Sequence, residues 1–89
     1  MINLKLTIIN KLGLHARAAN KLQNVCAQFS SRIQISHNGK TADGKSILSL
    51  MLLIAAKGSE LDIVIDGEDE GKAMAAITQL INERFGEPE

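Results

Sequence analysis

A histidine and an arginine stand where an apolar-periodic stretch begins, in Gly13-Leu14-His15-Ala16-Arg17-Ala18-Ala19. We expect a helix to start here, with its first N–H groups and the positive end of its dipole available to anions. Neutral imidazole is a nucleophile near pH 7, and a planar guanidinium fits phosphate oxygens. The motif therefore predicts that His15 accepts a phosphoryl group, which Arg17 and the backbone amides of residues 16–18 stabilise. A capping histidine beside a solvated arginine is the plainer alternative.

Length and composition limit the class of protein. The 89 residues suit one domain, residues 1–89, and a hydrophobic content of 45% is typical of a folded globule. Ten basic and ten acidic residues balance, and Trp and Tyr are absent, which disfavours nucleic-acid binding. The only cysteine, Cys26, excludes an internal disulfide and a Cys-x-x-Cys site. We expect no metal and no cofactor.

The chain shows neither a signal peptide nor a membrane-spanning segment. Its first residues, Met1-Ile2-Asn3-Leu4-Lys5, alternate instead of following a basic-then-apolar layout. The longest apolar run, residues 47–56, is interrupted by Ser49 and is shorter than a membrane span. We therefore expect a cytoplasmic protein without membrane insertion.

The elements that must position His15 are indicated by hydrophobic periodicity. Alternation predicts strands over residues 2–9, 32–36, 40–43 and 60–66, and Asn38-Gly39 predicts a hairpin between the second and third. Helical spacing predicts three helices: one after His15, one from the N-cap Ser46 to about residue 57, and one from residues 67–70 to about Phe85-Gly86. Pro88-Glu89 is predicted to be a tail. The order β-α-β-β-α-β-α indicates an α+β, open-faced β-sandwich, a four-stranded mainly antiparallel sheet with three helices on one face.

Three features have more than one interpretation. The second helix is apolar nearly all round over residues 47–54, which indicates either an exposed docking patch or tight burial under a neighbouring helix. The acidic cluster Gly67-Glu68-Asp69-Glu70 is interpreted as structural, since carboxylates complement a helix N-terminus. Metal binding by these carboxylates is the alternative, although no other ligands are evident. His37, beside the hairpin turn, is interpreted as a surface residue without visible partners, and the alternative is a second phosphorylation site.

Nearly the whole chain resembles the HPr family, the histidine-containing phosphocarriers of the bacterial phosphoenolpyruvate-dependent phosphotransferase system. The resemblance includes the element order and two motifs at family spacing, Gly13-Leu14-His15-Ala16-Arg17 and Lys45-Ser46-Ile47. It also includes the hairpin Asn38-Gly39-Lys40 and the segment Gly67-Glu68-Asp69-Glu70.

This resemblance implies a carrier and not an enzyme. His15 would accept a phosphoryl group from phosphorylated enzyme I and donate it to IIA-type acceptor domains of a sugar or nitrogen-related branch. Family members carry the phosphate on Nδ1. Ser46 matches the serine that an HPr kinase/phosphorylase modifies in many bacteria. The expected partner-docking residues are Leu14, Lys21, Lys45, Ile47, Leu48 and Met51.

One departure from the family and two rival functions stay open. Many members have proline where this chain has Ala18, which restores an N–H to the first helical turn. A regulatory binding module acting through Ser46 and the Ile47, Leu48 and Met51 patch, with an idle His15, is the first rival. A small phosphatase-like enzyme is the second, although no separate phosphate-binding loop is visible. We expect a monomer, because transient partners account for an apolar patch.

Overall fold

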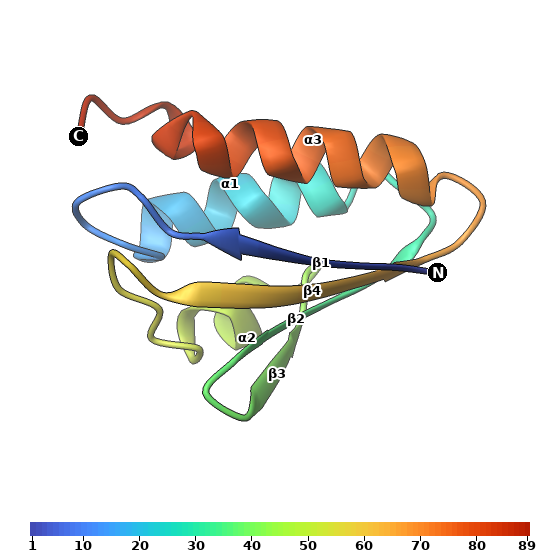
Figure 1. The fold of residues 1–89 in the computed structure, drawn as a ribbon, viewed down its shortest axis with the longest axis horizontal. Coiled ribbons are helices and arrows are strands. Elements are labelled where there is room, and N and C mark those ends of the chain that lie inside the picture. Colours follow the sequence, from blue (N-terminus) through green and yellow to red (C-terminus); the bar gives the residue numbers. More distant parts are fainter.

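Four antiparallel strands form one sheet in the order β1-β4-β2-β3 (Figure 1). The computed structural model describes all residues from Met1 to Glu89. The strands are β1 (Ile2–Thr7), β2 (Arg32–His37), β3 (Lys40–Asp43) and β4 (Glu60–Asp66). The β2–β3 hairpin turns at Asn38 and Gly39, whose φ angles of +50° and +80° fit the turn that the Asn-Gly pair predicts.

Three helices cover one face of this sheet. They are α1 (Ala16–Cys26), α2 (Ile47–Met51) and α3 (Glu70–Asn82), and a 3₁₀ turn (Arg84–Gly86) follows α3. Helices α1 and α3 lie side by side, and α2 lies near the β2–β3 end of the sheet (Figure 1). This arrangement confirms the predicted open-faced sandwich. No helix combines the length and apolar character needed to cross a membrane.

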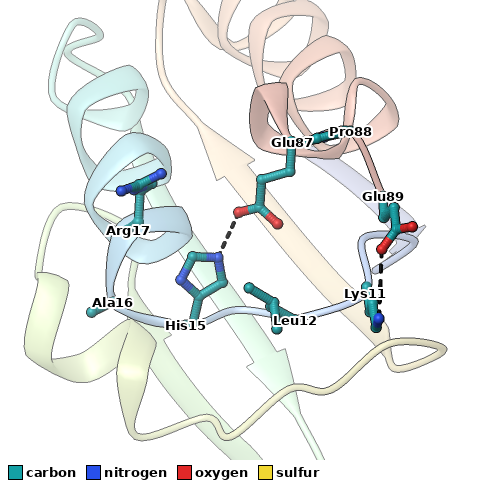
Figure 2. A pocket seen from close by; sticks show the side chains of 8 residues that line it. All are labelled: Lys11, Leu12, His15, Ala16, Arg17, Glu87, Pro88 and Glu89. Carbon is teal, nitrogen blue, oxygen red and sulfur yellow. Dashed lines mark hydrogen bonds and ion pairs between the residues drawn. The ribbon is translucent and has the colours of Figure 1, made fainter.

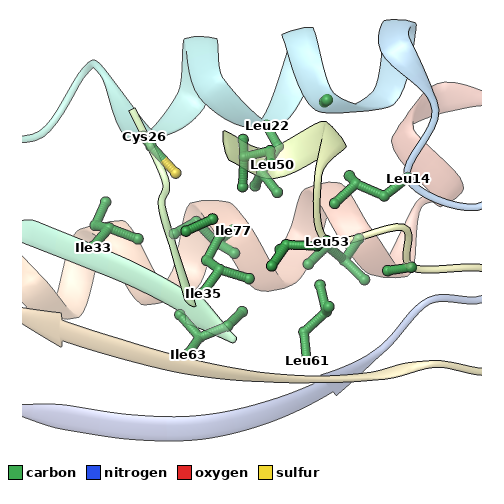
Figure 3. Close-up of a cluster of buried hydrophobic side chains, with 14 of the residues drawn as sticks. Leu14, Leu22, Cys26, Ile33, Ile35, Leu50, Leu53, Leu61, Ile63 and Ile77 are labelled. Atoms are coloured by element: carbon green, nitrogen blue, oxygen red, sulfur yellow. The ribbon is translucent and has the colours of Figure 1, made fainter. Parts of the chain in front are cut away.

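The core is aliphatic, as the scarcity of aromatic residues predicts. Figure 3 shows side chains from the sheet meeting side chains from all three helices in one cluster. Alternate strand residues supply one wall and the inner faces of the helices supply the other. The fully buried members include Leu22, Cys26, Ile33, Ile35, Leu50, Leu61, Ile63, Ile65, Ile77 and Ile81.

The third helix ends at Asn82 and not near Phe85-Gly86, because Arg84 and Phe85 adopt positive φ angles. Two other predicted boundaries are corrected beside the His15 loop. The second helix ends at Met51 and not near residue 57, because Ile54 adopts φ +50° and the chain turns back toward the His15 loop. Strand β1 ends at Thr7 and not at residue 9, because Ile8 leaves the sheet to exchange hydrogen bonds with residues 58 and 59. Both corrections arise where the loops 8–14 and 52–59 pair with each other.

The acidic cluster acts across the fold and not only at its own helix. Asp69 accepts hydrogen bonds from the backbone N–H groups of Ser30 at 2.8 Å and Ser31 at 3.0 Å, and from the Ser31 hydroxyl. The Ser31 hydroxyl and the Ser30 N–H hold the pKa of the Asp69 carboxyl at about 2. The structural interpretation of this cluster is thereby supported, with Asp69 joining the start of α3 to the end of the α1–β2 connection.

The C-terminal segment returns to the molecule and is not a free tail. Arg84 and Phe85 have φ angles of +58° and +55°, and the Phe85 side chain is fully buried. The reversal brings Glu89 beside the loop before α1, where its carbonyl oxygen accepts from the Lys11 N–H at 3.0 Å. Residues 87–89 therefore lie next to His15.

Candidate functional site

His15 is the N-cap of α1, with an extended backbone at φ −79° and ψ 179°. The loop before it is fixed by a hydrogen bond from the Leu14 N–H to the Ala55 carbonyl oxygen at 2.8 Å. Gly13 has φ +69°, and a Cβ there would lie 2.6 Å from the same oxygen. Glycine is therefore required for the close approach of this loop to residues 55–56.

His15 faces an open cleft of about 870 Å³ between the first turn of α1 and the C-terminal segment (Figure 2). The imidazole is 29% exposed, so a partner can reach it. Arg17 also lines the cleft and takes part in none of the ion pairs of the structure. The lining residues are Lys11, Leu12, His15, Ala16, Arg17, Glu87, Pro88 and Glu89.

The first backbone N–H groups of α1 are the second source of positive potential. The first helical hydrogen bond runs from the Ala19 N–H to the His15 carbonyl at 2.8 Å, so the N–H groups of residues 16–18 have no intrahelical acceptor. Ala16 and Arg17 line the cleft, whereas Ala18 is fully buried. Two of the three predicted amide donors therefore belong to residues that an anion in the cleft can reach.

Glu87 is the residue of this site that sequence reasoning missed. Its Oε2 lies 2.5 Å from His15 Nε2, and its Oε1 accepts a hydrogen bond from Asn10 Nδ2 at 3.0 Å. Partial burial raises the pKa of the Glu87 carboxyl, but the hydrogen bonds from His15 and Asn10 outweigh it and place the pKa below its ordinary value. Glu87 is thus a carboxylate at neutral pH. The large apolar side chain of Phe85, two residues earlier, was a sequence signal that this segment packs against the molecule.

Asn10 connects the His15 loop to the C-terminal segment from a fully buried position. Its Nδ2 donates to the Gly13 carbonyl oxygen at 2.8 Å as well as to Glu87. Its Oδ1 is buried without any partner, which costs about 1–3 kcal/mol. The two donated bonds therefore hold Asn10 in place at the expense of its own carbonyl oxygen. Asn10 was not among the residues that the sequence indicated for this site.

The segment after Ser46 divides its apolar residues between core and surface. Leu50 and Leu53 are buried, whereas Ile47, Leu48 and Met51 are 38%, 68% and 40% exposed. The segment is thus buried on one side and exposed on the other. An apolar groove of about 410 Å³ beside His15 continues the exposed surface and is lined by Leu12, Leu14, His15, Ala16, Met51, Ile54, Ala55 and Ala56.

The remaining predicted docking residues are partly engaged inside the molecule. Lys21 Nζ donates to the Phe85 carbonyl oxygen at 2.6 Å, and Lys45 Nζ donates to the Phe29 carbonyl oxygen at 2.7 Å. Leu14 is only 5% exposed, because it packs into the core, and it offers little surface to a partner.

Two further sequence interpretations concern Ser46 and His37. The Ser46 hydroxyl accepts a hydrogen bond from the Ser49 N–H at 3.3 Å, which confirms the predicted N-cap. The prediction that His37 has no partner was wrong, since its Nδ1 donates to the Leu53 carbonyl oxygen at 3.0 Å. Helix α2 ends at Met51, and the carbonyl group of Leu53 in the turn that follows lies beside His37 at the end of β2.

A partly exposed imidazole at a helix start, beside an unpaired arginine and an exposed apolar surface, fits the class of small group-carrier domains. Comparison with known proteins identifies the family. The model described as "PTS HPr component phosphorylation site" matches residues 2–83. The chain belongs to the HPr family, whose members are phosphocarriers of the phosphotransferase system and not enzymes.

Individual relatives agree with this assignment over the full length. Phosphocarrier protein HPr of Neisseria meningitidis is 49% identical over 89 residues, covering 100% of both chains. The crystal structure of HPr-C-His from Thermoanaerobacter tengcongensis superposes with a TM-score of 0.95 at 35% identity, again covering 100% of both chains. The predicted fold and family are therefore confirmed.

Two other matches bear on the branch and on the oligomeric state. Phosphocarrier protein NPr of Shewanella violacea is 39% identical over 83 residues, covering 93% of this chain and 91% of the relative. A crystal structure of an HPr dimer from Thermoanaerobacter tengcongensis matches with a TM-score of 0.78 at 36% identity, covering 98% of this chain and 100% of that one.

Proposed function

We propose that this chain carries a phosphoryl group on His15, accepts it from phosphorylated enzyme I and donates it to IIA-type acceptor domains of the phosphotransferase system. The supporting observation is the position of His15 at the N-cap of α1, in an open cleft that it shares with an unpaired Arg17. The acceptors belong to the sugar or the nitrogen-related branch, and the similarity to both HPr and NPr proteins fits either.

Phosphoryl transfer requires a nucleophile and groups that neutralise the negative charge of the phosphoryl oxygens. The free ring nitrogen of His15 gives its electron pair to phosphorus while the bond from phosphorus to the donor breaks and its electrons leave with the donor. Arg17 and the amides of Ala16 and Arg17 face the negative charge on the phosphoryl oxygens. The cleft is open, so the partner completes the site and the carrier does not retain the group.

Partner docking is proposed for the exposed apolar surface next to His15. Ile47, Leu48 and Met51 present flexible side chains, and the groove of Leu12 and Ile54 connects them to the phosphorylation site. One surface then serves donor and acceptors in turn. We propose a cytoplasmic monomer, since lasting self-association through this surface would compete with both partners.

Regulation is proposed at Ser46. A phosphoryl group there would add roughly two negative charges at the edge of the docking surface. We infer that an HPr kinase/phosphorylase performs this modification and that it weakens the docking of enzyme I. Because the Ser46 hydroxyl already caps α2, the modification alters a side chain that the fold positions.

The carrier proposal is tested by intact mass after incubation with phosphoenolpyruvate and enzyme I, before and after mild acid. We expect one acid-labile phosphate on the wild type and on His37→Ala, and none on His15→Ala. His37 is the matched control, as the only other histidine. If the wild type takes up no phosphate while an authentic HPr does in the same tube, the carrier proposal is wrong and a regulatory module acting through Ser46 becomes the leading function.

The regulatory proposal has a separate test. ATP and an HPr kinase should add one acid-stable phosphate to the wild type and none to Ser46→Ala. The phosphorylated wild type should then accept phosphate from enzyme I more slowly than the unmodified protein. An unchanged rate would contradict regulation at Ser46 without affecting the role of His15.

A further inference from the structure

We propose that Glu87 is a positioning residue that holds His15 with its hydrogen on Nε2, so that Nδ1 presents its electron pair to the phosphoryl donor. This inference rests on the proposed carrier function of His15, but its first part concerns the unphosphorylated protein and can be measured there. Glu87 lies beyond residues 2–83, the stretch that matches the family model.

The geometry fixes the direction of each hydrogen bond in the connection from Asn10 to His15. Asn10 Nδ2 lies 2.8 Å from a carbonyl oxygen of Gly13 and 3.0 Å from Oε1 of Glu87, and both are acceptors. The amide of Asn10 cannot be turned over without setting its oxygen against the Gly13 oxygen. Asn10 thus holds the Glu87 carboxylate with one oxygen toward itself and the other toward the ring.

The second carboxylate oxygen determines where the ring hydrogen sits. Glu87 Oε2 is 2.5 Å from His15 Nε2, and a carboxylate can only accept, so Nε2 must donate. A neutral imidazole carries one ring hydrogen, which leaves Nδ1 unprotonated. In Figure 2 the ring turns Nε2 toward Glu87 and its other nitrogen away, on the side of Ala16 and Arg17. The free nitrogen thus lies on the same side of the ring as the start of α1.

The carboxylate also favours the transfer itself. When Nδ1 gives its electron pair to phosphorus, the new N–P bond forms, the bond to the donor breaks, and Nε2 keeps its hydrogen. The ring then carries a positive charge, and Glu87 faces that charge directly. When the phosphoryl group moves on to an acceptor, the electron pair returns to Nδ1 and the ring is neutral again. Glu87 therefore acts through His15 and does not touch the transferred group.

The decisive comparison is between Glu87→Gln and Glu87→Ala. In Glu87→Gln, the Asn10 amide still requires an acceptor, so the glutamine oxygen should face Asn10 and its NH₂ group should face His15. Nε2 would then become the acceptor and the ring hydrogen would move to Nδ1, which blocks the nucleophile. Glu87→Ala removes the constraint, and water allows both tautomers. We therefore expect the more conservative substitution to cause the larger defect.

Ring ¹⁵N chemical shifts of His15, measured by NMR near pH 8 without any phosphoryl donor, report the tautomer. We expect the Nε2–H form in the wild type, the Nδ1–H form in Glu87→Gln, and a mixture in Glu87→Ala. Glu89→Gln is the matched control, because it removes the same charge from the same segment and its side chain pairs with Lys11 and not with the ring. Its tautomer should match the wild type.

Single-turnover phosphorylation by enzyme I gives the second readout. Losing a charge-assisted hydrogen bond to the reacting ring should slow Glu87→Gln about tenfold to a hundredfold, with Glu87→Ala less affected. A wild-type ring without a preference for Nε2–H, an unchanged tautomer in Glu87→Gln, or a larger rate loss in Glu87→Ala than in Glu87→Gln would overturn the inference. If the tautomers change as expected but even the wild type accepts no phosphate, the carrier proposal fails and the orientation of the ring by Glu87 stands.

Discussion

Leu50 and Leu48 lie two residues apart in α2, and the same substitution should have opposite consequences at the two positions. The Leu50 side chain is 0% exposed within the core, whereas Leu48 is 68% exposed. Leu50→Ala removes a buried side chain and leaves a cavity, which costs about 2–5 kcal/mol. In a domain of this size each kcal/mol lowers Tm by about 4–8 °C. We therefore expect Leu50→Ala to lower Tm by at least about 8 °C.

Leu48→Ala should change the free energy of unfolding by less than about 0.5 kcal/mol, as is usual for an exposed position. Urea unfolding at pH 7 measures the free energy of unfolding of both variants and of the wild type. Titration of each folded variant against enzyme I then measures docking, which we expect Leu48→Ala to weaken and Leu50→Ala to preserve. If Leu48→Ala proves as destabilising as Leu50→Ala, the division of this segment into a buried and an exposed side is wrong.

Three further predictions test single contacts. Burial raises the pKa of the Cys26 thiol to about 12 from 9.0. At pH 8 a disulfide reagent should therefore react with Cys26 of the folded protein about a thousandfold more slowly than with a free thiol, and unfolding in urea should remove this difference. The pKa of Asp69 is depressed to about 2 from 3.8, so the wild type should be more stable than Asp69→Asn above about pH 4 and lose this advantage toward pH 2. Urea unfolding measures the difference in free energy of unfolding between the two proteins, and an equal difference at both pH values would contradict this prediction. Gly13→Ala should unfold at lower urea than Gly58→Ala, because both have positive φ but only Gly13 approaches the Ala55 oxygen.

The sheet was largely predictable because its signal is local. Strands β3 and β4 have the predicted bounds, and Asn38-Gly39 forms the predicted hairpin. Both predictions depend only on neighbouring residues, through the alternation of apolar and polar side chains and through the turn preference of Asn-Gly. The overlong second helix shows the limit of such signals. Residues 52–56 are as apolar as a helix core, but Leu53 is buried from a turn and not from a helix. Pairing with the distant loop 8–14 decided their conformation.

Only the part of the candidate site that consists of consecutive residues could be predicted from the sequence. His15, Arg17 and the first amides of α1 are consecutive, so their spacing alone indicated phosphate chemistry. Glu87 and Asn10 are 77 residues apart and meet only through the tertiary fold. Neither an asparagine in a loop nor a glutamate in the C-terminal segment carries a pattern of its own. The contact of Glu87 with the His15 ring, on which the proposed tautomer rests, was therefore not predictable from the sequence.

The turn at Arg84 and Phe85 explains why the C-terminal segment can reach the site at all. Two consecutive non-glycine residues with left-handed φ cost about 1–2 kcal/mol each. Full burial of the Phe85 side chain returns roughly 1.5–3 kcal/mol, and Lys21 adds a hydrogen bond to the Phe85 carbonyl. The strain is thus offset at the point where the chain reverses, two residues before Glu87. Because Lys21 belongs to α1, the helix that carries His15 also holds the turn that aims Glu87 at it.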